Sequence, residues 1–179
     1  IKIIFYLFLS LTIIFTLLFK LLSYSWTESI QLSMALISTS NGYNPNGEII
    51  VEANVITKIV MIFAMRFGSL SINLHYKSFA NGFLSYFKNK NFKLAFILIF
   101  SITFFITLGF FNNVKISFFE KYVETCFLII SFISTTGLIP NDLYKYGALT
   151  NLVLVLGLFT LIGGSVSSTT GGLKPTRLI

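Results

Sequence analysis

Charged residues are scarce in this sequence. They make up 11% of its 179 residues, whereas a soluble domain usually carries about 25%. Hydrophobic residues account for 55%, phenylalanine alone occurs 21 times, and the mean hydropathy is +0.84. So few charges cannot cover that much apolar surface in a soluble domain of this length. The composition therefore excludes a soluble enzyme, a nucleic-acid reader and a disordered segment, and it predicts a protein embedded in a lipid bilayer.

Cysteine and histidine occur once each, as Cys126 and His75. A single cysteine excludes an internal disulfide and a cysteine-based metal cluster, and a single histidine excludes a multi-histidine metal site. No Gly-x-Ser-x-Gly motif occurs, and the acidic residues lie outside the apolar runs. A membrane enzyme needs a nucleophile with a base, or two acids, inside the bilayer. We therefore predict that the chain is not an enzyme and holds no covalently bound cofactor.

Long apolar runs predict the membrane spans. Residues 3–19 carry no charge, and at about 1.5 Å per residue they extend roughly 26 Å, close to the thickness of a bilayer core. Residues 94–112 form a second clear span, and residues 147–162 form a shorter third one. Residues 53–76 are also long enough, but they contain two basic residues and are a weaker candidate. The absence of an initiating methionine, and an apolar run directly at Ile1, suggest a fragment of a larger membrane protein.

The weaker candidate contains Lys58, Arg66 and His75, which have different expected roles. Lys58 lies toward the outer side, where we expect its side chain to snorkel to the surface. Arg66 lies roughly ten residues before the cytoplasmic end, about 15 Å deep. It either makes a structural pair or forms a barrier to cations, because an intramembrane arginine usually faces a partner or a water-filled cavity. For His75, at the cytoplasmic edge, we expect a structural hydrogen-bonding role.

Two further apolar segments, 29–38 and 125–134, are too short to cross a bilayer and predict re-entrant or buried helices. Hydroxyl and acidic residues precede each, as suits a helix N-terminus: Ser25, Thr27 and Glu28 before the first, Glu120 and Glu124 before the second. The segment 77–93 carries four lysines and no acid. The positive-inside rule places it in the cytoplasm and the short helices on the outer side.

The two halves share a pattern. Glu28-Ser29 precedes Ile37-Ser38-Thr39-Ser40 at the same spacing at which Glu124-Thr125 precedes Ile133-Ser134-Thr135-Thr136, and a glycine follows each. The repeated unit is a span, a short helix, a Ser/Thr-Gly loop and a second span. Both copies run in the same direction, which favours a pore built by symmetry over the inverted repeats of many secondary transporters.

Non-helical backbone at membrane depth is tolerated where it is buried or lines a water-filled path. The extended carbonyls of such a loop can replace the water shell of a cation, as in potassium channels, and glycine permits backbone angles that turn a carbonyl toward the axis. The alternative is a polar turn between two helices. The occurrence of two loops at matched positions favours the filter.

These residues resemble the Trk/Ktr/HKT superfamily of cation transporters, most closely the bacterial Trk-type potassium uptake subunit. The most specific match is IGGSVSSTTGGLKPTR at 162–177, similar to the family's Gly-Gly, Ser/Thr, Gly-Gly, Lys, Arg signature. ISTSNGY (37–43) and ISTTGL (133–138) look like its second and third pore loops, and GSLSINLHY (68–76) is similar to the end of its second repeat. The resemblance covers essentially the whole chain.

The resemblance implies an all-α membrane protein with two tandem units of a four-repeat, potassium-channel-like pore. Residues 1–79 would be the second repeat of the family, 80–93 a cytoplasmic basic loop, and 94–179 the third repeat. The family's filter positions fall on Thr39, Ser40, Asn41 and Gly42, and on Ser134, Thr135, Thr136 and Gly137, with potassium held at their carbonyls. The family often has glycine at the position of Asn41.

The Gly-rich stretch 163–172 lacks the Gly-Lys-Ser/Thr ending of a phosphate-binding loop, because Leu173 separates Gly172 from Lys174. It is expected to be a pore-lining or gating loop formed by Gly163, Gly164, Ser165, Ser167, Ser168, Thr169, Thr170, Gly171 and Gly172.

The implied function is potassium uptake across the bacterial inner membrane by a multi-pass protein. The alternative is a sodium- or proton-coupled secondary cation transporter of broader selectivity. The implied partners are membrane lipid, a second copy of the full-length subunit and a cytosolic nucleotide-binding gating ring. The net charge of +7 does not imply nucleic acid, because the basic residues fall between apolar runs.

Overall fold

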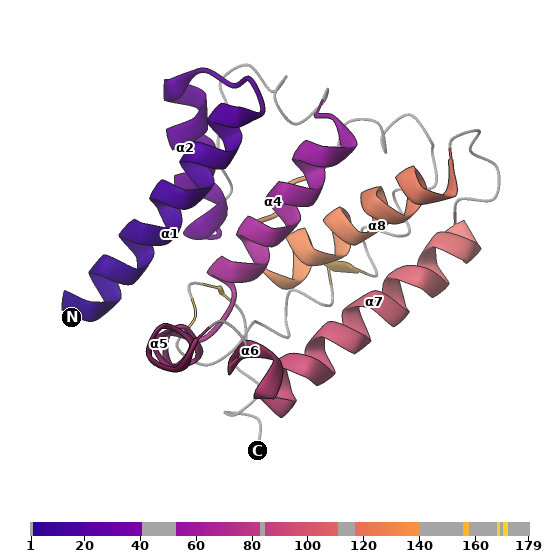
Figure 1. Cartoon of the computed structure of the whole chain (residues 1–179). Coiled ribbons are helices and arrows are strands. Elements are labelled where there is room, and N and C mark those ends of the chain that lie inside the picture. Colours follow the sequence, from indigo (N-terminus) through magenta and orange to yellow (C-terminus); the bar gives the residue numbers. More distant parts are fainter. Residues whose placement is uncertain are drawn as a thin grey trace.

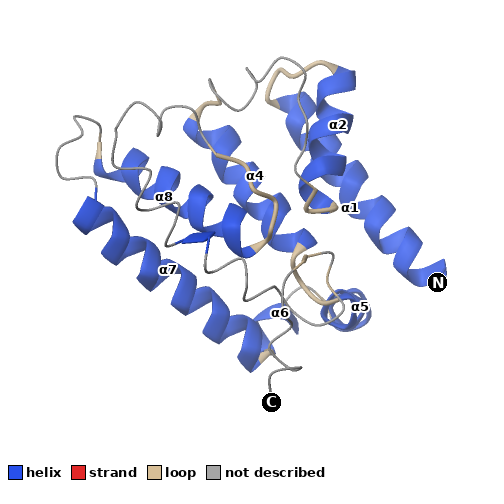
Figure 2. Ribbon diagram, turned by 180° about the vertical axis from the view of Figure 1, so that it is seen from behind, coloured by secondary structure: helices blue, strands red, loops and turns tan. Residues whose placement is uncertain are grey.

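The computed structural model describes residues 2–40, 53–82, 85–110 and 117–139, together with Leu156, Gly157, Ser168, Thr170 and Gly171. All regular secondary structure within these residues is helical (Figures 1 and 2). The chain is thus an all-α membrane protein, as the sequence predicts. The predicted third span, 147–162, lies outside the described residues except for Leu156 and Gly157.

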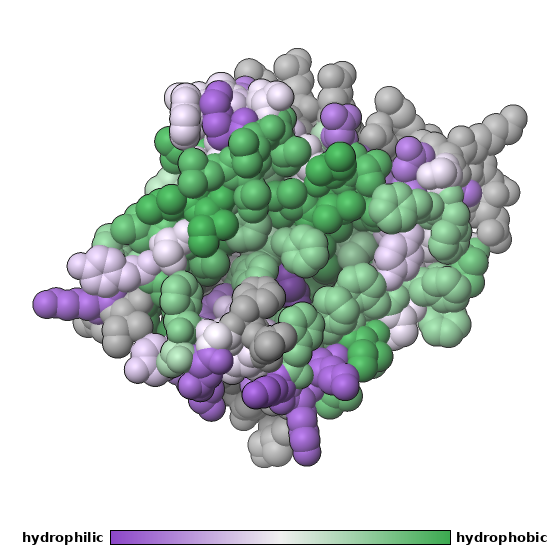
Figure 3. All heavy atoms as spheres, viewed as in Figure 1, coloured by the Kyte–Doolittle hydropathy of each residue, from purple (hydrophilic) through white to green (hydrophobic). Residues whose placement is uncertain are grey.

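Two long apolar helices confirm the two clear spans. Helix α1 covers Lys2–Leu21, and α7 covers Lys90–Phe110. Each contains a charge-poor stretch long enough to cross a bilayer, Ile4–Leu21 in α1 and Phe92–Gly109 in α7. Figure 3 shows apolar residues over the middle of one face, with most hydrophilic residues at its upper and lower edges. An apolar belt between two polar edges is the surface that a bilayer requires.

The weaker span candidate, 53–76, is not a single helix. Helix α4 covers Val55–Gly68 and α5 covers Ile72–Asn81, and the two meet at an angle of 102°. Ser71 caps α5 by accepting a hydrogen bond from the Leu74 N–H at 3.3 Å. A new N-cap three residues after the last residue of α4 favours a break over a continuous helix. Within the described residues, two helices are long and apolar enough to span, or three spans if the bent pair counts as one.

The two short helices are present, and both begin with a capping box. Helix α2 covers Trp26–Ile37 and is capped by Ser25 and Glu28, whereas α8 covers Phe118–Ile133 and is capped by Ser117 and Glu120. The hydrogen bonds from the Ser25 N–H and hydroxyl hold the pKa of the Glu28 carboxyl below its usual value. In each box two otherwise unpaired N–H groups at the helix start are satisfied.

Helix α8 has 16 residues and α2 has 12, so α8 is longer by about one turn. The acidic residue Glu124 therefore lies in the second turn of its helix, not at the N-terminus where the sequence pattern places it.

The short helices pack against the long ones. Helix α2 lies beside α1, and α8 lies between α4 and α7 (Figures 1 and 2). The hydroxyls of Thr16 on α1 and Ser33 on α2 are 2.6 Å apart and both are buried. The least exposed large apolar side chains come from α1, α2, α4 and α8, together with Leu156: Phe19, Leu36, Met61, Met65, Phe127, Leu128, Ile129 and Leu156. The core thus joins both predicted units into one body.

The basic segment 77–93 is largely helical rather than a loop. It contains the end of α5, the short helix α6 at Ser85–Lys88 and the start of α7. His75 of α5 is fully buried, with Nδ1 2.7 Å from the Tyr86 hydroxyl and Nε2 2.9 Å from the Phe67 carbonyl oxygen. The expected structural role of His75 is confirmed, because these contacts tie α4, α5 and α6 together.

Candidate cation-binding site

The C-termini of α2 and α8 end in the same backbone geometry. In α2 the Thr39 N–H donates to the Leu36 carbonyl at 3.3 Å and the Ser40 N–H donates to the Ala35 carbonyl at 3.0 Å. In α8 the corresponding bonds run from Thr135 to Phe132 at 3.0 Å and from Thr136 to Ser131 at 2.9 Å. This is the Schellman pattern, which satisfies carbonyls at a helix end. The predicted repeat therefore extends to individual hydrogen bonds.

A threonine occupies the left-handed position in both motifs. The φ angles are 50° at Thr39 and 58° at Thr135. Glycine is the usual residue at this position, and a β-branched residue there is a genuine outlier. Such a conformation costs about 1–3 kcal/mol and persists where the surrounding structure fixes it. Both helix ends therefore place a threonine, with its hydroxyl group, in a strained conformation that glycine would adopt without strain.

Hydroxyl groups hold each loop against its helix end. The Ser38 and Ser40 hydroxyls are 3.0 Å apart, and the equivalent Ser134 and Thr136 hydroxyls are 2.7 Å apart. In the second loop, Ser131 is also a bonding centre. Its carbonyl accepts from the Thr136 and Gly137 N–H groups, and its hydroxyl donates to the Leu138 carbonyl at 2.7 Å. Gly137 has φ 71°, the left-handed conformation for which glycine was expected at this position.

The N–H and hydroxyl groups of the second loop donate their hydrogen bonds to other acceptors than the loop's own main-chain carbonyls. In the described part of the chain, the main-chain carbonyls of Ser134, Thr135, Thr136 and Gly137 accept no hydrogen bond. They lie at the C-terminus of α8, where the aligned peptide dipoles amount to about half a negative charge. Main-chain oxygens beside a negative helix end can coordinate a cation that has lost its water shell. Asn41 and Gly42 of the first loop lie outside the described residues.

The Gly-rich stretch reaches the second loop at one described contact. The Gly171 N–H donates to the Thr135 hydroxyl oxygen at 2.9 Å. The Ser168 and Thr170 hydroxyls lie 2.6 Å apart, and Thr170 is buried. Gly163, Gly164, Ser165, Ser167, Thr169 and Gly172 lie outside the described residues. A side chain of the second loop thus contacts the segment expected to gate the pore.

Arg66 lies in the last turn of α4, two residues before the helix ends at Gly68, not ten residues before the end of a span. Its guanidinium carbon is 5.9 Å from the centre of the Phe92 ring, and Nη1 is 3.4 Å from the Ser69 hydroxyl. Its Nε is buried and has no hydrogen-bond partner among the described residues. The side chain therefore packs between the end of α4 and the start of α7.

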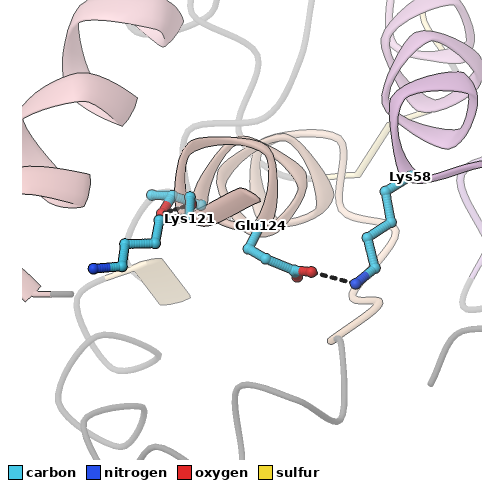
Figure 4. Close-up of polar contacts among 4 residues, drawn as sticks. Lys58, Lys121 and Glu124 are labelled. Atoms are coloured by element: carbon cyan, nitrogen blue, oxygen red, sulfur yellow. Dashed lines mark hydrogen bonds and ion pairs between the residues drawn. The ribbon is translucent and has the colours of Figure 1, made fainter. Parts of the chain in front are cut away.

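Lys58 does not snorkel. It is the fourth residue of α4, is 5% exposed, and forms a salt bridge with Glu124 of α8, which is 8% exposed. Figure 4 shows the two side chains pointing toward one another from their helices. The sequence-based expectations treated Lys58 and Glu124 in separate segments and therefore did not include this pair. The available signal was one basic and one acidic residue within or beside apolar segments, since an isolated charge there is costly and usually has a partner.

Gly68, the last residue of α4, touches the end of α2. A Cβ added to Gly68 would lie 2.4 Å from the Ile37 carbonyl oxygen and 3.1 Å from the Leu36 carbonyl oxygen. Only glycine allows the two backbones to approach this closely. Since Ile37 is two residues before Thr39, Gly68 lies directly beside the base of the first loop.

Comparisons with known proteins agree with this geometry. No protein-family model matches the chain. The chain is 30% identical over 181 residues to an uncharacterized cation transporter of Methanocaldococcus jannaschii, in an alignment that covers 100% of this chain and 35% of the relative. The crystal structure of the potassium transporter TrkH from Vibrio parahaemolyticus matches 99% of this chain with a TM-score of 0.82 and 23% sequence identity.

That match covers 38% of the TrkH chain, so this chain spans little more than a third of the length of either protein. The structural likeness shows that the chain has the TrkH fold over this part. Together, the two comparisons support a relationship to Trk-type cation transporters.

Proposed function

We propose that this chain forms two adjacent units of a longer membrane subunit that takes up potassium through a channel-like filter. The observation that carries the proposal is the second loop, in which four consecutive carbonyls accept no hydrogen bond among the described residues and lie at the C-terminus of a short helix. The first loop has the same Schellman geometry and the same strained threonine. Two matched loops provide two sides of a cation-coordinating ring.

The longer subunit is supported by the extent of the comparisons, because the chain covers 35% and 38% of the two proteins that it matches. Two further units would complete the ring of carbonyls. We further propose that the complete subunit lies in the bacterial inner membrane as a multi-pass protein, that it forms a homodimer, and that a cytosolic nucleotide-binding ring controls it. These partners follow from the resemblance to the Trk/Ktr/HKT superfamily.

In this proposal the Gly-rich stretch 163–172 obstructs the path below the filter. The hydrogen bond from Gly171 to Thr135 supports a position next to the second loop. For Arg66, the contact with the Phe92 ring supports a structural role at the end of α4 over a barrier to cations. A guanidinium stacked on an aromatic ring is stabilised locally and has less freedom to extend into a water-filled path.

Rubidium uptake into liposomes that contain the purified complete subunit tests the proposal. With a potassium gradient alone, we expect uptake that potassium inhibits and sodium inhibits weakly. Uptake that requires an imposed sodium or proton gradient would favour the alternative, a secondary cation transporter of broader selectivity. Uptake that potassium and sodium inhibit equally would contradict the selective filter.

A further inference from the structure

We propose that Lys58 and Glu124 form a positioning pair that fixes the rotation of α8 and thereby the place of the second filter loop. This inference rests on the proposed function and adds two residues that lie outside the two filter loops. The pair joins the two predicted units, because Lys58 lies on α4 of the first unit and Glu124 on the short helix α8 of the second.

The surroundings of the pair make its geometry specific. Both residues are almost fully buried, and their charged groups meet between α4 and α8, which pack along one another. Residues 123–132 of α8 are all buried, and most are apolar. Apolar side chains can repack when a helix rotates, whereas a buried ion pair requires its two charged groups to stay facing one another. Pairs of this kind are best attested as devices that select a register.

Stability alone does not account for the pair. Replacing a buried ion pair with apolar residues of similar size is often neutral or stabilising, while removal of one partner leaves an uncompensated charge. The pair therefore does more to select one arrangement of α4 and α8 than to raise the free energy of unfolding. This difference allows the two roles to be separated by experiment.

Rotation of α8 reaches the filter directly, because Ser134 caps the helix and the loop follows without a linker. The helix backbone lies about 2.3 Å from its axis, so a rotation of about 20° displaces the backbone by about 0.8 Å. The carbonyls of Ser134–Gly137 would move with it. Coordination of one cation in preference to another depends on the positions and number of such oxygens.

The chain provides a control on the same helix. Lys121 lies three residues before Glu124, and Figure 4 shows its side chain pointing away from Glu124. Lys121→Met removes a charge from α8 without touching the pair. It therefore separates the effect of the pair from a general effect of charge on this helix.

The deciding variant is the double replacement Lys58→Met with Glu124→Met in the complete subunit, which removes both charges of the pair together. The assay measures the ratio of potassium to sodium permeability in liposomes, with the amount of folded protein matched. We expect this ratio to fall by about fivefold or more, a coupling of ordinary size for contacting residues, while Lys121→Met leaves it unchanged. The charge-exchanged variant, Lys58→Glu with Glu124→Lys, should recover part of the ratio.

An unchanged ratio in the double methionine variant would overturn the positioning role, whatever its effect on protein yield. Equal permeability of the unmodified subunit to both ions would instead contradict the proposed filter. The two failures are thus distinguishable, because the first appears only in the variant and the second appears before any substitution.

Discussion

The replacement Gly68→Ala tests whether the end of α4 supports the first loop. In the interior of an ordinary helix, alanine is more favourable than glycine by about 0.8–1 kcal/mol. At Gly68 the new Cβ would lie 2.4 Å from the Ile37 carbonyl oxygen, well inside ordinary contact distance. The obstacle is backbone, so α2 or α4 must shift, and overpacking of this kind costs about 1–3 kcal/mol. We therefore expect a net loss of up to about 2 kcal/mol.

Gly109 of α7 provides the matched control, because a Cβ added there has no neighbour within 4 Å. Gly109→Ala should leave stability unchanged or raise it by up to about 1 kcal/mol. Thermal unfolding of both variants of the complete subunit in detergent measures the difference in stability, and rubidium uptake at matched protein amounts measures the effect on the first loop. We expect Gly68→Ala to unfold at a lower temperature than Gly109→Ala and to lose selectivity for potassium. Equal unfolding temperatures would refute the close approach of α2 and α4.

Three further predictions concern the second loop and Arg66. Thr135→Val keeps the β-branched shape but removes the acceptor of the Gly171 N–H, a bond of about 1 kcal/mol; rubidium flux should rise, and a flux equal to that of the unmodified subunit counts against a gating contact. Gly137→Ser places a side chain at φ 71°, a strain of about 1–2 kcal/mol; selectivity for potassium should fall with protein still in the membrane, and an unaltered ion preference would exclude Gly137 from the filter. Arg66→Ala should lower thermal stability if stacking on Phe92 is its role or raise cation flux if it is a barrier; normal values of both would contradict both interpretations.

The spans and short helices were predictable because their signals are local. Uninterrupted apolar runs predicted α1 and α7 to within a few residues, and the hydroxyl and acidic residues before each short helix form capping boxes. The break after Gly68 was harder to recognise, because the two helices on either side of it together are long and apolar enough to count as one span. Its signal was Ser71, an N-cap residue inside an apparent span. Hydropathy averages over a window, whereas a single hydrogen bond from a capping side chain decides where a new helix begins.

The pairing of charges was not predictable from segment-by-segment reading. Lys58 and Glu124 are 66 residues apart, and the sequence does not specify which face of each helix meets the other. The repeat also predicts the wrong position for Glu124. At equal spacing from the two loops, Glu28 corresponds to Glu124, but Glu28 caps the start of α2 whereas Glu124 is buried in α8. The additional turn at the start of α8 accounts for the difference.

Helix α4 contacts both short helices by two different means. Its last residue, Gly68, allows backbone contact with the end of α2, and near its start Lys58 pairs with Glu124 of α8. The first contact depends on the absence of a side chain, and the second depends on two opposite charges. Because α2 and α8 end directly in the two matched loops, a tilt or rotation of α4 would displace both loops together. The relative position of the two loops, on which the proposed filter depends, is therefore linked through α4 as well as through the packing of α2 on α1 and of α8 on α7.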